Sequence, residues 1–141
     1  MLDAPAENLG HVVMLSGSSP PMPCGVGDSA YELALALTDA GLDVEILADT
    51  RAEPDESESC RVPVHADIDR WGFFGIRKLA RRIESLEPDI LHIHYPSKAY
   101  GSGLAVPFLP GLIHARRRHF KIVLTIHEFK LIHRLRRLAS F

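Results

Sequence analysis

The residues best suited to chemistry follow an apolar run near the end of the sequence. The segment Ile122–Ile126 has the sequence IVLTI, and His127 and Glu128 come directly after it. A histidine at the end of a buried strand can bind a hydroxyl group or transfer a proton, and an adjacent carboxylate can bind hydroxyls or orient a neighbour. The alternative is a polar pair that only caps a following helix. We take His127 as the candidate catalytic residue and Glu128 as a candidate substrate-binding residue.

A second candidate site is the loop that follows the first apolar run. It extends from Ser16 to Asp28 and contains Gly25 and Gly27. Free N–H groups at a helix N-terminus attract phosphate, and glycine lets a ligand approach the backbone closely. The loop is long and contains three prolines, so it does not match the GxGxxG pattern of dinucleotide-binding dehydrogenases. A turn shaped by glycine and proline, without a ligand, is the alternative.

A third candidate site is the segment HIHYPSKAYG, which begins at His92. Its hydroxyls and one cation suit a polyhydroxy or anionic ligand, and the candidate substrate-binding residues are Ser97, Lys98 and Tyr100. His92 and His94 lie on one face of a predicted strand. A metal pair there is conceivable, but no third ligand has suitable spacing. We therefore predict no metal site and a structural role for both histidines, because buried histidines commonly satisfy backbone groups.

The two cysteines give little indication of thiol chemistry. Cys24 and Cys60 have neither CxxC spacing nor the density of a disulfide framework, so a reducing, cytoplasmic location is the simpler interpretation. Cys24 lies beside a predicted helix N-terminus, where a thiolate would be stabilised, but local spacing ties no histidine to it. We therefore favour a non-catalytic role for Cys24 over catalytic thiol chemistry.

Apolar runs and amphipathic stretches alternate along the chain. The runs predict strands at His11–Leu15, Asp43–Leu47, Arg61–His65, Ile90–His94 and Ile122–Ile126. The third is the weakest, because Pro63 cannot donate a ladder hydrogen bond and favours a sheet edge. The last is apolar throughout and is expected to be buried.

Helical patterns fill the intervals between these strands. Ser29 and Glu32 can form a capping box for the first helix, and Gly41 suits its end. A second helix has its apolar stripe at Ile76, Leu79, Ala80, Ile83 and Leu86. Residues 101–119 have a helical pattern interrupted by two prolines, which predicts two short pieces. The final segment is again helical in pattern.

This alternation predicts an α/β fold, a Rossmann-like parallel sheet with helices on both faces. A chain of 141 residues fits one domain, which we place at residues 11–141 after a flexible N-terminus at 1–10. In an open parallel sheet, ligands bind beyond the carboxyl ends of the strands. The three candidate sites should therefore share one edge.

The composition is that of a globular protein with nearly balanced charge. A formal net charge of −2 gives no basic surface for nucleic acid. We expect neither a signal peptide nor a membrane span, because no run approaches the ~18 apolar residues of a spanning helix. Basic residues accompany an apolar stripe near the C-terminus at Lys130, Arg134 and Arg137, with a second cluster at Arg116–Arg118. A solvated face is the simpler interpretation, and peripheral contact with the inner membrane face is the alternative.

Considered together, the three loops resemble the N-terminal domain of family 4 glycosyltransferases, GT-B-fold enzymes in which two Rossmann-like halves face a cleft. The resemblance runs from about His11 to the C-terminus. It rests on MLSGSSPPMPCGVGDSAYELALAL, PDILHIHYPSKAYG and TIHEF. It implies that this half shapes the acceptor site, that Gly25 and Gly27 approach the donor diphosphate, and that His127 faces the donor sugar.

The resemblance also implies an activity. Such enzymes transfer a sugar from a nucleotide-sugar donor to a glycan, lipid or small-molecule acceptor, with retained configuration, without a metal or other cofactor, and with electrostatic stabilisation of the departing diphosphate. The C-terminal donor-binding domain has no counterpart before Phe141. We therefore expect the chain to be inactive alone and to need a partner that supplies that domain.

Two other functions remain open from the sequence. The chain could be a non-catalytic module that binds a glycan or a partner through its cleft edge, in which case an unpaired apolar patch would promote self-association. A stand-alone nucleotide binder would need an acidic ribose anchor at the end of the second strand. Only Asp49 could supply it.

Overall fold

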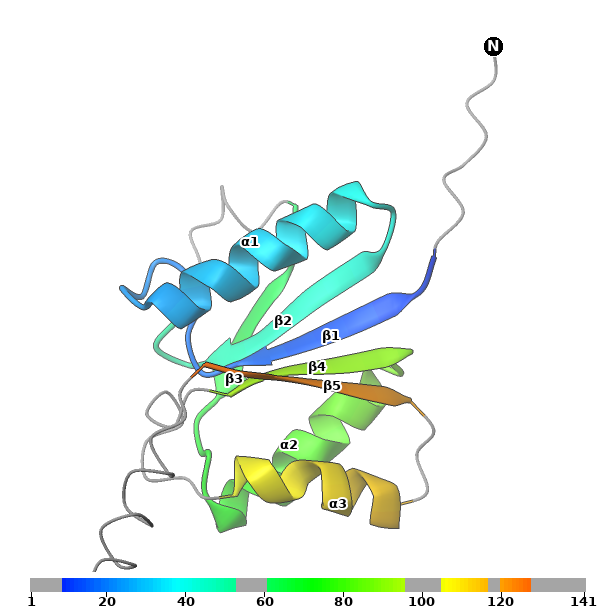
Figure 1. Ribbon diagram of the computed structural model, residues 1–141. Coiled ribbons are helices and arrows are strands. Elements are labelled where there is room, and N and C mark those ends of the chain that lie inside the picture. The colour runs from blue at the N-terminus through cyan, green and yellow to red at the C-terminus, as the bar shows by residue number, and fades with distance from the viewer. Residues whose placement is uncertain (1–8, 53–60, 96–104, 117–119, 128–141) are drawn as a thin grey trace, which may run out of the picture.

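Strands and helices alternate along the whole of the described chain (Figure 1). The computed structural model describes residues 9–52, 61–95, 105–116 and 120–127. Its elements are β1 (His11–Ser16), α1 (Gly25–Asp39), β2 (Asp43–Asp49), β3 (Val64–Ile68), α2 (Phe73–Ser85), β4 (Ile90–Tyr95), the short 3₁₀ helix η1 (Val106–Phe108), α3 (Leu109–Ala115) and β5 (Lys121–Ile126).

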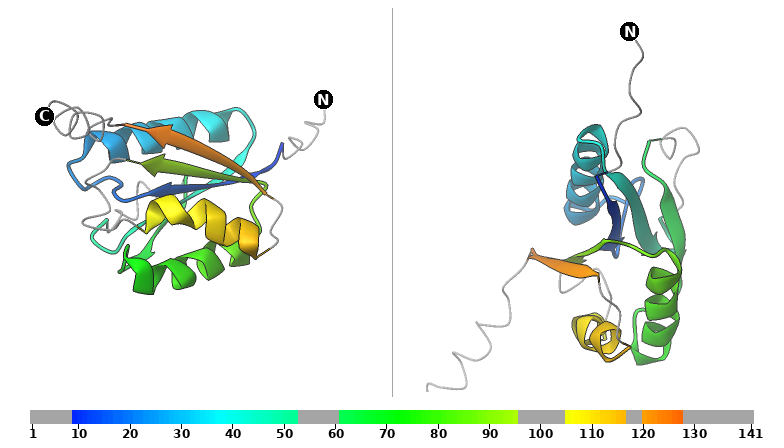
Figure 2. Two further views of the ribbon diagram at one scale, coloured as in Figure 1. Left: turned by 60° about the horizontal axis from the view of Figure 1, so that its bottom comes forward. Right: turned by 90° about the vertical axis from the view of Figure 1, so that its right-hand side faces the viewer.

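The five strands form one parallel sheet in the order β3-β2-β1-β4-β5. Helix α1 lies on one face of the sheet, and α2 and α3 lie side by side on the other (Figures 1 and 2). The predicted α/β fold, a Rossmann-like parallel sheet with helices on both faces, is confirmed.

Each face of the sheet has its own hydrophobic core, because successive side chains of a strand point to opposite faces. Val12 and Met14 of β1 pack with Ala34 of α1. Val13 and Leu15 pack toward α2 and α3 in the second core. A strand covered on both faces needs apolar side chains at every position, which explains the continuous apolar run of β1.

Helix α1 begins four residues earlier than the sequence indicated. The backbone N–H of Asp28 donates to the carbonyl of Cys24 at 2.9 Å, which places Gly25 in the first turn and makes Cys24 the N-cap. Ser29 therefore lies inside the helix, and the predicted capping box was wrong. The expected end is confirmed, because the helix stops at Asp39 and Gly41 has a φ of +93°, a left-handed conformation that glycine adopts without strain.

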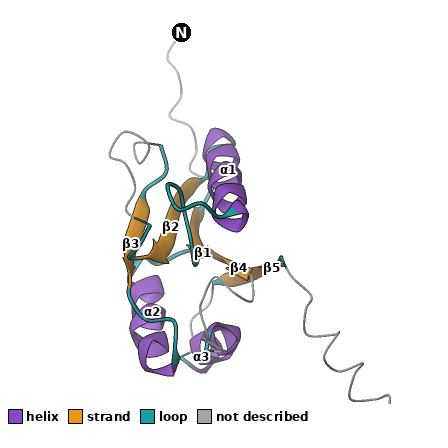
Figure 3. Ribbon diagram, turned by 90° about the vertical axis from the view of Figure 1, so that its left-hand side faces the viewer, coloured by secondary structure: helices purple, strands orange, loops and turns teal. Residues whose placement is uncertain are grey.

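The two edge strands also differ from expectation. Strand β3 starts at Val64, after Pro63, whose carbonyl accepts a hydrogen bond from the N–H of Ile46 at 2.9 Å. It is an edge strand, as predicted. The expectation that β5 is buried was wrong: β5 is the other edge, and Val123, Leu124 and Ile126 are 44%, 51% and 43% exposed. Helix α1 packs against β1 and β2 and leaves β5 outside its cover (Figure 3).

The other helical predictions that fall on described residues agree with the structure, and the helical pattern of the final segment lies outside those residues. Helix α2 ends at Ser85, before Pro88. Within the described part of residues 101–119, Pro107 lies in η1 and Pro110 in the first turn of α3, so the stretch does form two short pieces. Proline is tolerated in a first turn because its missing N–H would have no helical partner there.

Two buried carboxylates brace the fold. Asp49, at the end of β2, accepts hydrogen bonds from Trp71 Nε1 at 2.8 Å and from Arg51 Nε at 2.8 Å. The Glu84 carboxylate of α2 accepts two hydrogen bonds from the Arg116 guanidinium, and this pair joins α2 to the end of α3. The exposed fraction of each acid is below 10%, so both depend on these partners for solvation.

Replacement of Gly75 by alanine is expected to destabilise the protein. A Cβ at Gly75 would lie 2.1 Å from the carbonyl oxygen of Arg70, so the loop before α2 would have to move. We expect a loss of about 1–3 kcal/mol in the free energy of unfolding. Gly111→Ala in α3 is the matched control, because no atom lies within 4 Å of its added Cβ, and it should stabilise by up to about 1 kcal/mol. Urea denaturation of both variants tests this, and an unaffected Gly75→Ala variant would contradict the packing argument.

The hydrogen bonds to the Asp49 carboxylate should make the free energy of unfolding depend on pH. Burial opposes ionisation of Asp49, but hydrogen bonds from Arg51 and Trp71 outweigh burial and lower its pKa. A lowered folded-state pKa stabilises the fold above the ordinary value of about 4, and this contribution is lost as pH falls through the lower folded value.

Asp49→Asn should therefore cost about 1–3 kcal/mol at pH 7, and its difference from the wild type should shrink below about pH 4. Thermal unfolding between pH 7 and pH 3 measures this. Asp69→Asn is the control, because the Asp69 carboxylate is half-exposed and forms only a 3.4 Å pair with Lys78. A pH-independent Asp49→Asn difference would show that the charge of Asp49 does not act in folding.

Candidate functional site

The centre of the sheet contains the point where the chain reverses its direction of winding. From β1 the chain passes through α1 to β2, and from β3 it returns through α2, on the opposite face, to β4 beside β1 (Figure 1). Ligands of open α/β sheets bind at this point, beyond the carboxyl ends of the strands. Ser16 of β1 is paired with His94 of β4 there, so these two residues mark the position of the candidate site.

Three imidazole rings lie together at this edge. The ring centroids of His92 and His94 are 4.3 Å apart, and those of His94 and His127 are 5.4 Å apart with an interplanar angle of 24°. His92 and His94 occupy alternate positions to Leu91 and Ile93, which pack toward α2 and α3. They therefore face the same side as α1, where α1 covers β1 and β2.

Hydrogen bonds fix the three rings. His92 Nε2 lies 2.8 Å from the hydroxyl of Thr125, and His94 Nδ1 lies 3.2 Å from His127 Nε2. The backbone N–H of His127 donates to the carbonyl of Tyr95 at 3.1 Å, which holds the main chain after β5 against β4. The structural role expected for His92 agrees with its Thr125 partner. The contact of His94 with His127 was not predicted.

Burial keeps two of the rings uncharged at neutral pH. It lowers the pKa of His94 to about 4, with smaller contributions from the like charges of His92 and His127. It also lowers the pKa of His92, and His127 adds to that effect. His94 is 2% exposed and His92 is 9% exposed. Burial disfavours the charged imidazolium, so both rings act as neutral hydrogen-bonding groups.

The described residues hold no group of three or more His, Cys, Asp or Glu side chains that could bind a metal ion. The ring nitrogens explain this for the histidines. His94 and His127 direct nitrogens at each other, and a nitrogen of His92 meets the Thr125 hydroxyl. They do not converge on one point.

The two glycines at the junction of the β1–α1 loop and α1 differ in the space around them. Among the described residues, no atom lies within 4 Å of a Cβ built on Gly25, so they leave the first turn of α1 open to a ligand there. A Cβ on Gly27 would lie 2.8 Å from Ser18 Oγ and 2.9 Å from the Ser18 carbonyl carbon. Gly27 is therefore required for the loop to pack against the helix. A diphosphate role for either glycine stays a prediction.

Cys24 is a free thiol at the N-cap of α1. The nearby Ser18 hydroxyl lowers its pKa, and the backbone N–H groups of Gly27 and Val26 contribute in the same direction, while burial and the charge of Asp28 oppose them. This agrees with the stabilised thiolate expected at a helix N-terminus.

The structure weakens the interpretation of the chain as a stand-alone nucleotide binder. Both oxygens of the Asp49 carboxylate accept hydrogen bonds, Oδ1 from Arg51 and Oδ2 from Arg51 and Trp71. The side chain is also 8% exposed. A ribose would have to displace these partners, so Asp49 is occupied as a structural brace.

The other predicted site residues lie outside the described residues: Ser97, Lys98, Tyr100 and Glu128, together with Arg117, Arg118, Lys130, Arg134 and Arg137 of the basic clusters. Arg116 is described, and its guanidinium pairs with the buried Glu84. That member of the basic cluster has a structural role. No helix in the described part of the chain is both long and apolar enough to cross a membrane.

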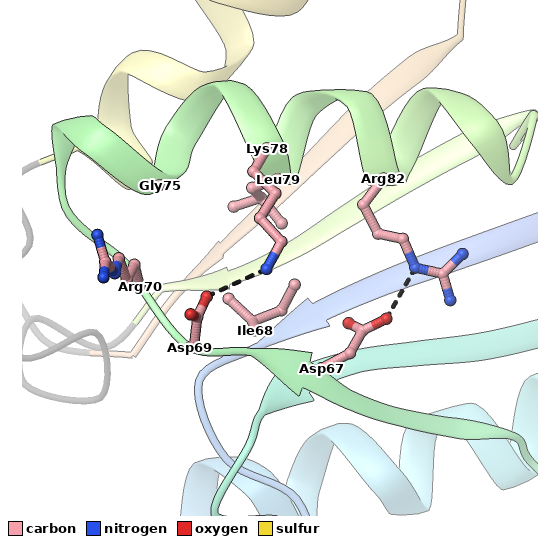
Figure 4. A pocket seen from close by; sticks show the side chains of 8 residues that line it. All are labelled: Asp67, Ile68, Asp69, Arg70, Gly75, Lys78, Leu79 and Arg82. Atoms are coloured by element: carbon pink, nitrogen blue, oxygen red, sulfur yellow. Dashed lines mark hydrogen bonds and ion pairs between the residues drawn. The ribbon is translucent and has the colours of Figure 1, made fainter.

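Two hollows lie away from the histidines. One is between β3 and α2, where the Lys78–Asp69 pair (3.4 Å) and the Arg82–Asp67 pair (2.9 Å) lie in its wall (Figure 4). Both of its carboxylates are paired with basic side chains that are at least partly exposed, and Arg70 adds a third base to the lining. The other is an apolar hollow between β4, β5 and α3. It is on the opposite face of the sheet from His94.

Comparison with known proteins agrees with this architecture. No curated protein matched the chain. The family model described as Glycosyltransferase Family 4 matches residues 23–140, a span that includes α1, the histidines and every strand after β1. The chain therefore belongs to glycosyltransferase family 4.

Proposed function

We propose that this chain is the acceptor-side half of a retaining glycosyltransferase. It would transfer a sugar from a nucleotide-sugar donor to a glycan, lipid or small-molecule acceptor, without a metal or other cofactor. Turnover would require a donor-binding domain that forms the opposite wall of the cleft, in the same polypeptide or from a partner. The proposal also places the reaction in the cytoplasm, with peripheral membrane contact if the acceptor is a lipid.

The observation that carries this proposal is the position of His127. Its ring follows β5 at the carboxyl edge of the sheet, is half-buried, and contacts His94 beside the β1–β4 pairing. A ring held at that edge is placed to hydrogen-bond a sugar hydroxyl in the cleft. The family match, which includes this residue, supports the assignment.

The first turn of α1 provides a second part of the proposed cleft. The first helical hydrogen bond of α1 comes from the N–H of Asp28, and no side chain caps the N-terminus. The N–H groups of the preceding residues, of which those of Val26 and Gly27 also act on the Cys24 thiol, would bind an oxyanion of the donor diphosphate. Stabilisation of the charge that develops on the departing diphosphate accelerates transfer.

Donor titration of the chain alone and with an added donor-binding domain tests the proposal. Calorimetry with uridine and guanosine diphosphate sugars should detect no binding to the chain alone. Addition of the donor-binding domain of a family 4 enzyme should restore transfer to an acceptor with retained anomeric configuration. Turnover by the chain alone would refute the half-enzyme model, and inverted product would refute the retaining mechanism.

His127→Ala should lower the transfer rate of the completed enzyme by about 100-fold or more. Stability should change little, because the ring is half-buried. His114→Ala is the control, since His114 is an exposed histidine of α3 away from the cleft edge. Single-turnover rates and thermal unfolding of both variants separate catalysis from folding. An unchanged rate for His127→Ala would remove His127 from the mechanism.

Gly25→Val should weaken donor binding without a loss of stability. The added side chain enters open space in front of the first turn of α1, where it would obstruct a diphosphate. Gly27→Val should instead destabilise the protein, because its side chain meets the Ser18 backbone. Unfolding curves together with donor affinity in the completed enzyme test the distinction. Equal donor affinity for wild type and Gly25→Val would place the diphosphate elsewhere.

A non-catalytic partner-binding module is the second candidate function. The observation in its favour is the edge strand β5, which exposes apolar side chains at Val123, Leu124 and Ile126. Exposed apolar edges of this kind are binding or aggregation surfaces. The donor titration separates the two functions, because a module of this class would not restore transfer in the completed enzyme.

A further inference from the structure

The hydrogen bond between His94 and His127 limits the combinations of tautomers that the two rings can adopt. A neutral imidazole has one donor nitrogen and one acceptor nitrogen. His94 Nδ1 and His127 Nε2 lie 3.2 Å apart, so one of these two atoms carries the proton and the other accepts it. The position of the proton on one ring therefore determines its position on the other.

His94 is the better fixed of the two residues. It lies within β4, is 2% exposed, and its ring is enclosed by His92 at 4.3 Å and His127 at 5.4 Å. His127 follows the last residue of β5 and is half-buried. Orientation is therefore imposed by His94 on His127, and not in the reverse direction.

The charge state of His94 permits this arrangement. Among the described residues, His92 and His127 contact the His94 ring, and His94 stays neutral because burial opposes its protonation. A neutral His94 can donate a hydrogen bond to His127 or accept one from it, whereas a protonated His94 could only donate.

We propose that His94 is a positioning residue that ties the tautomer of His127 to its own and holds the ring so that His127 meets its ligand through Nδ1. Nε2 is used by the contact with His94, and no contact among the described residues occupies Nδ1. The backbone bond from His127 to Tyr95 fixes the main chain, and the bond to His94 fixes the ring. The identity of the ligand, a donor-sugar hydroxyl, rests on the proposed function; the tautomer does not.

Long-range ¹H–¹⁵N correlation NMR of the histidine rings tests this on the chain itself. In the wild type at pH 7.5, the neutral rings of His94 and His127 should carry their protons on the same nitrogen, both on Nδ1 or both on Nε2. His94→Phe should return His127 to the tautomer mixture of a free imidazole. His94→Asn keeps an amide near the position of Nδ1 and should move the His127 mixture back toward that of the wild type. Thr125→Val is the control, because it removes the partner of His92 and should leave His127 unchanged.

Protons on different nitrogens of the two rings in the wild type would overturn the proposal, and this measurement does not depend on whether any variant folds. A His127 tautomer ratio that is unchanged in folded His94→Phe would also overturn it. In the completed enzyme, His94→Phe should lower turnover by about 10- to 100-fold, as expected for a misplaced reacting group, and His94→Asn should recover part of the loss. If the tautomer result holds while His127→Ala transfers normally, the proposed function fails and the positioning by His94 stands.

Discussion

The pairing of β1 with β4 is the constraint on which the rest of the structure depends. These strands lie at the centre of the sheet, and Val13, Leu15, Leu91 and Ile93 are at most 1% exposed. A shift of one residue would move each apolar set to the other face, so the register is fixed by both cores at once. The same register pairs Ser16 with His94. The hydrophobic cores thereby determine which polar groups meet at the carboxyl edge.

The fold could be predicted from the sequence where a local pattern determines the structure. Strand β1 is apolar from Val12 to Leu15 because both of its faces are covered, and this pattern is visible in the residues alone. The errors arose where contacts outside the local sequence pattern determine the structure. Helix α1 begins at Gly25 because Gly27 fits beneath Ser18, and β5 is exposed because it has one neighbouring strand and lies outside the cover of α1.

The site was predictable only in part, for the same reason. His127 was selected as a candidate because it follows a strand, and the edge where ligands bind is a property of the fold class. The contact of His94 with His127 was not predicted, because it depends on β5 being the neighbour of β4 and on a register that pairs His94 with Thr125. Alternating polar residues at 92 and 94, followed by 125 and 127, are the signal in the sequence, but they become informative only once the strand order is known.

The histidines of β4 are less favourable for stability than aliphatic residues would be at the same positions. Leu91 and Ile93 bury apolar side chains, whereas His92 and His94, on the same strand, bury rings whose polar atoms need partners. Aliphatic residues would avoid the cost of desolvating those nitrogens. Departures from the simplest packing occur mainly at functional sites, and this one lies at the carboxyl end of a central strand and leads to His127. The arrangement is best explained if the rings serve the ligand-binding edge, with the loss in stability offset by the two cores beneath them.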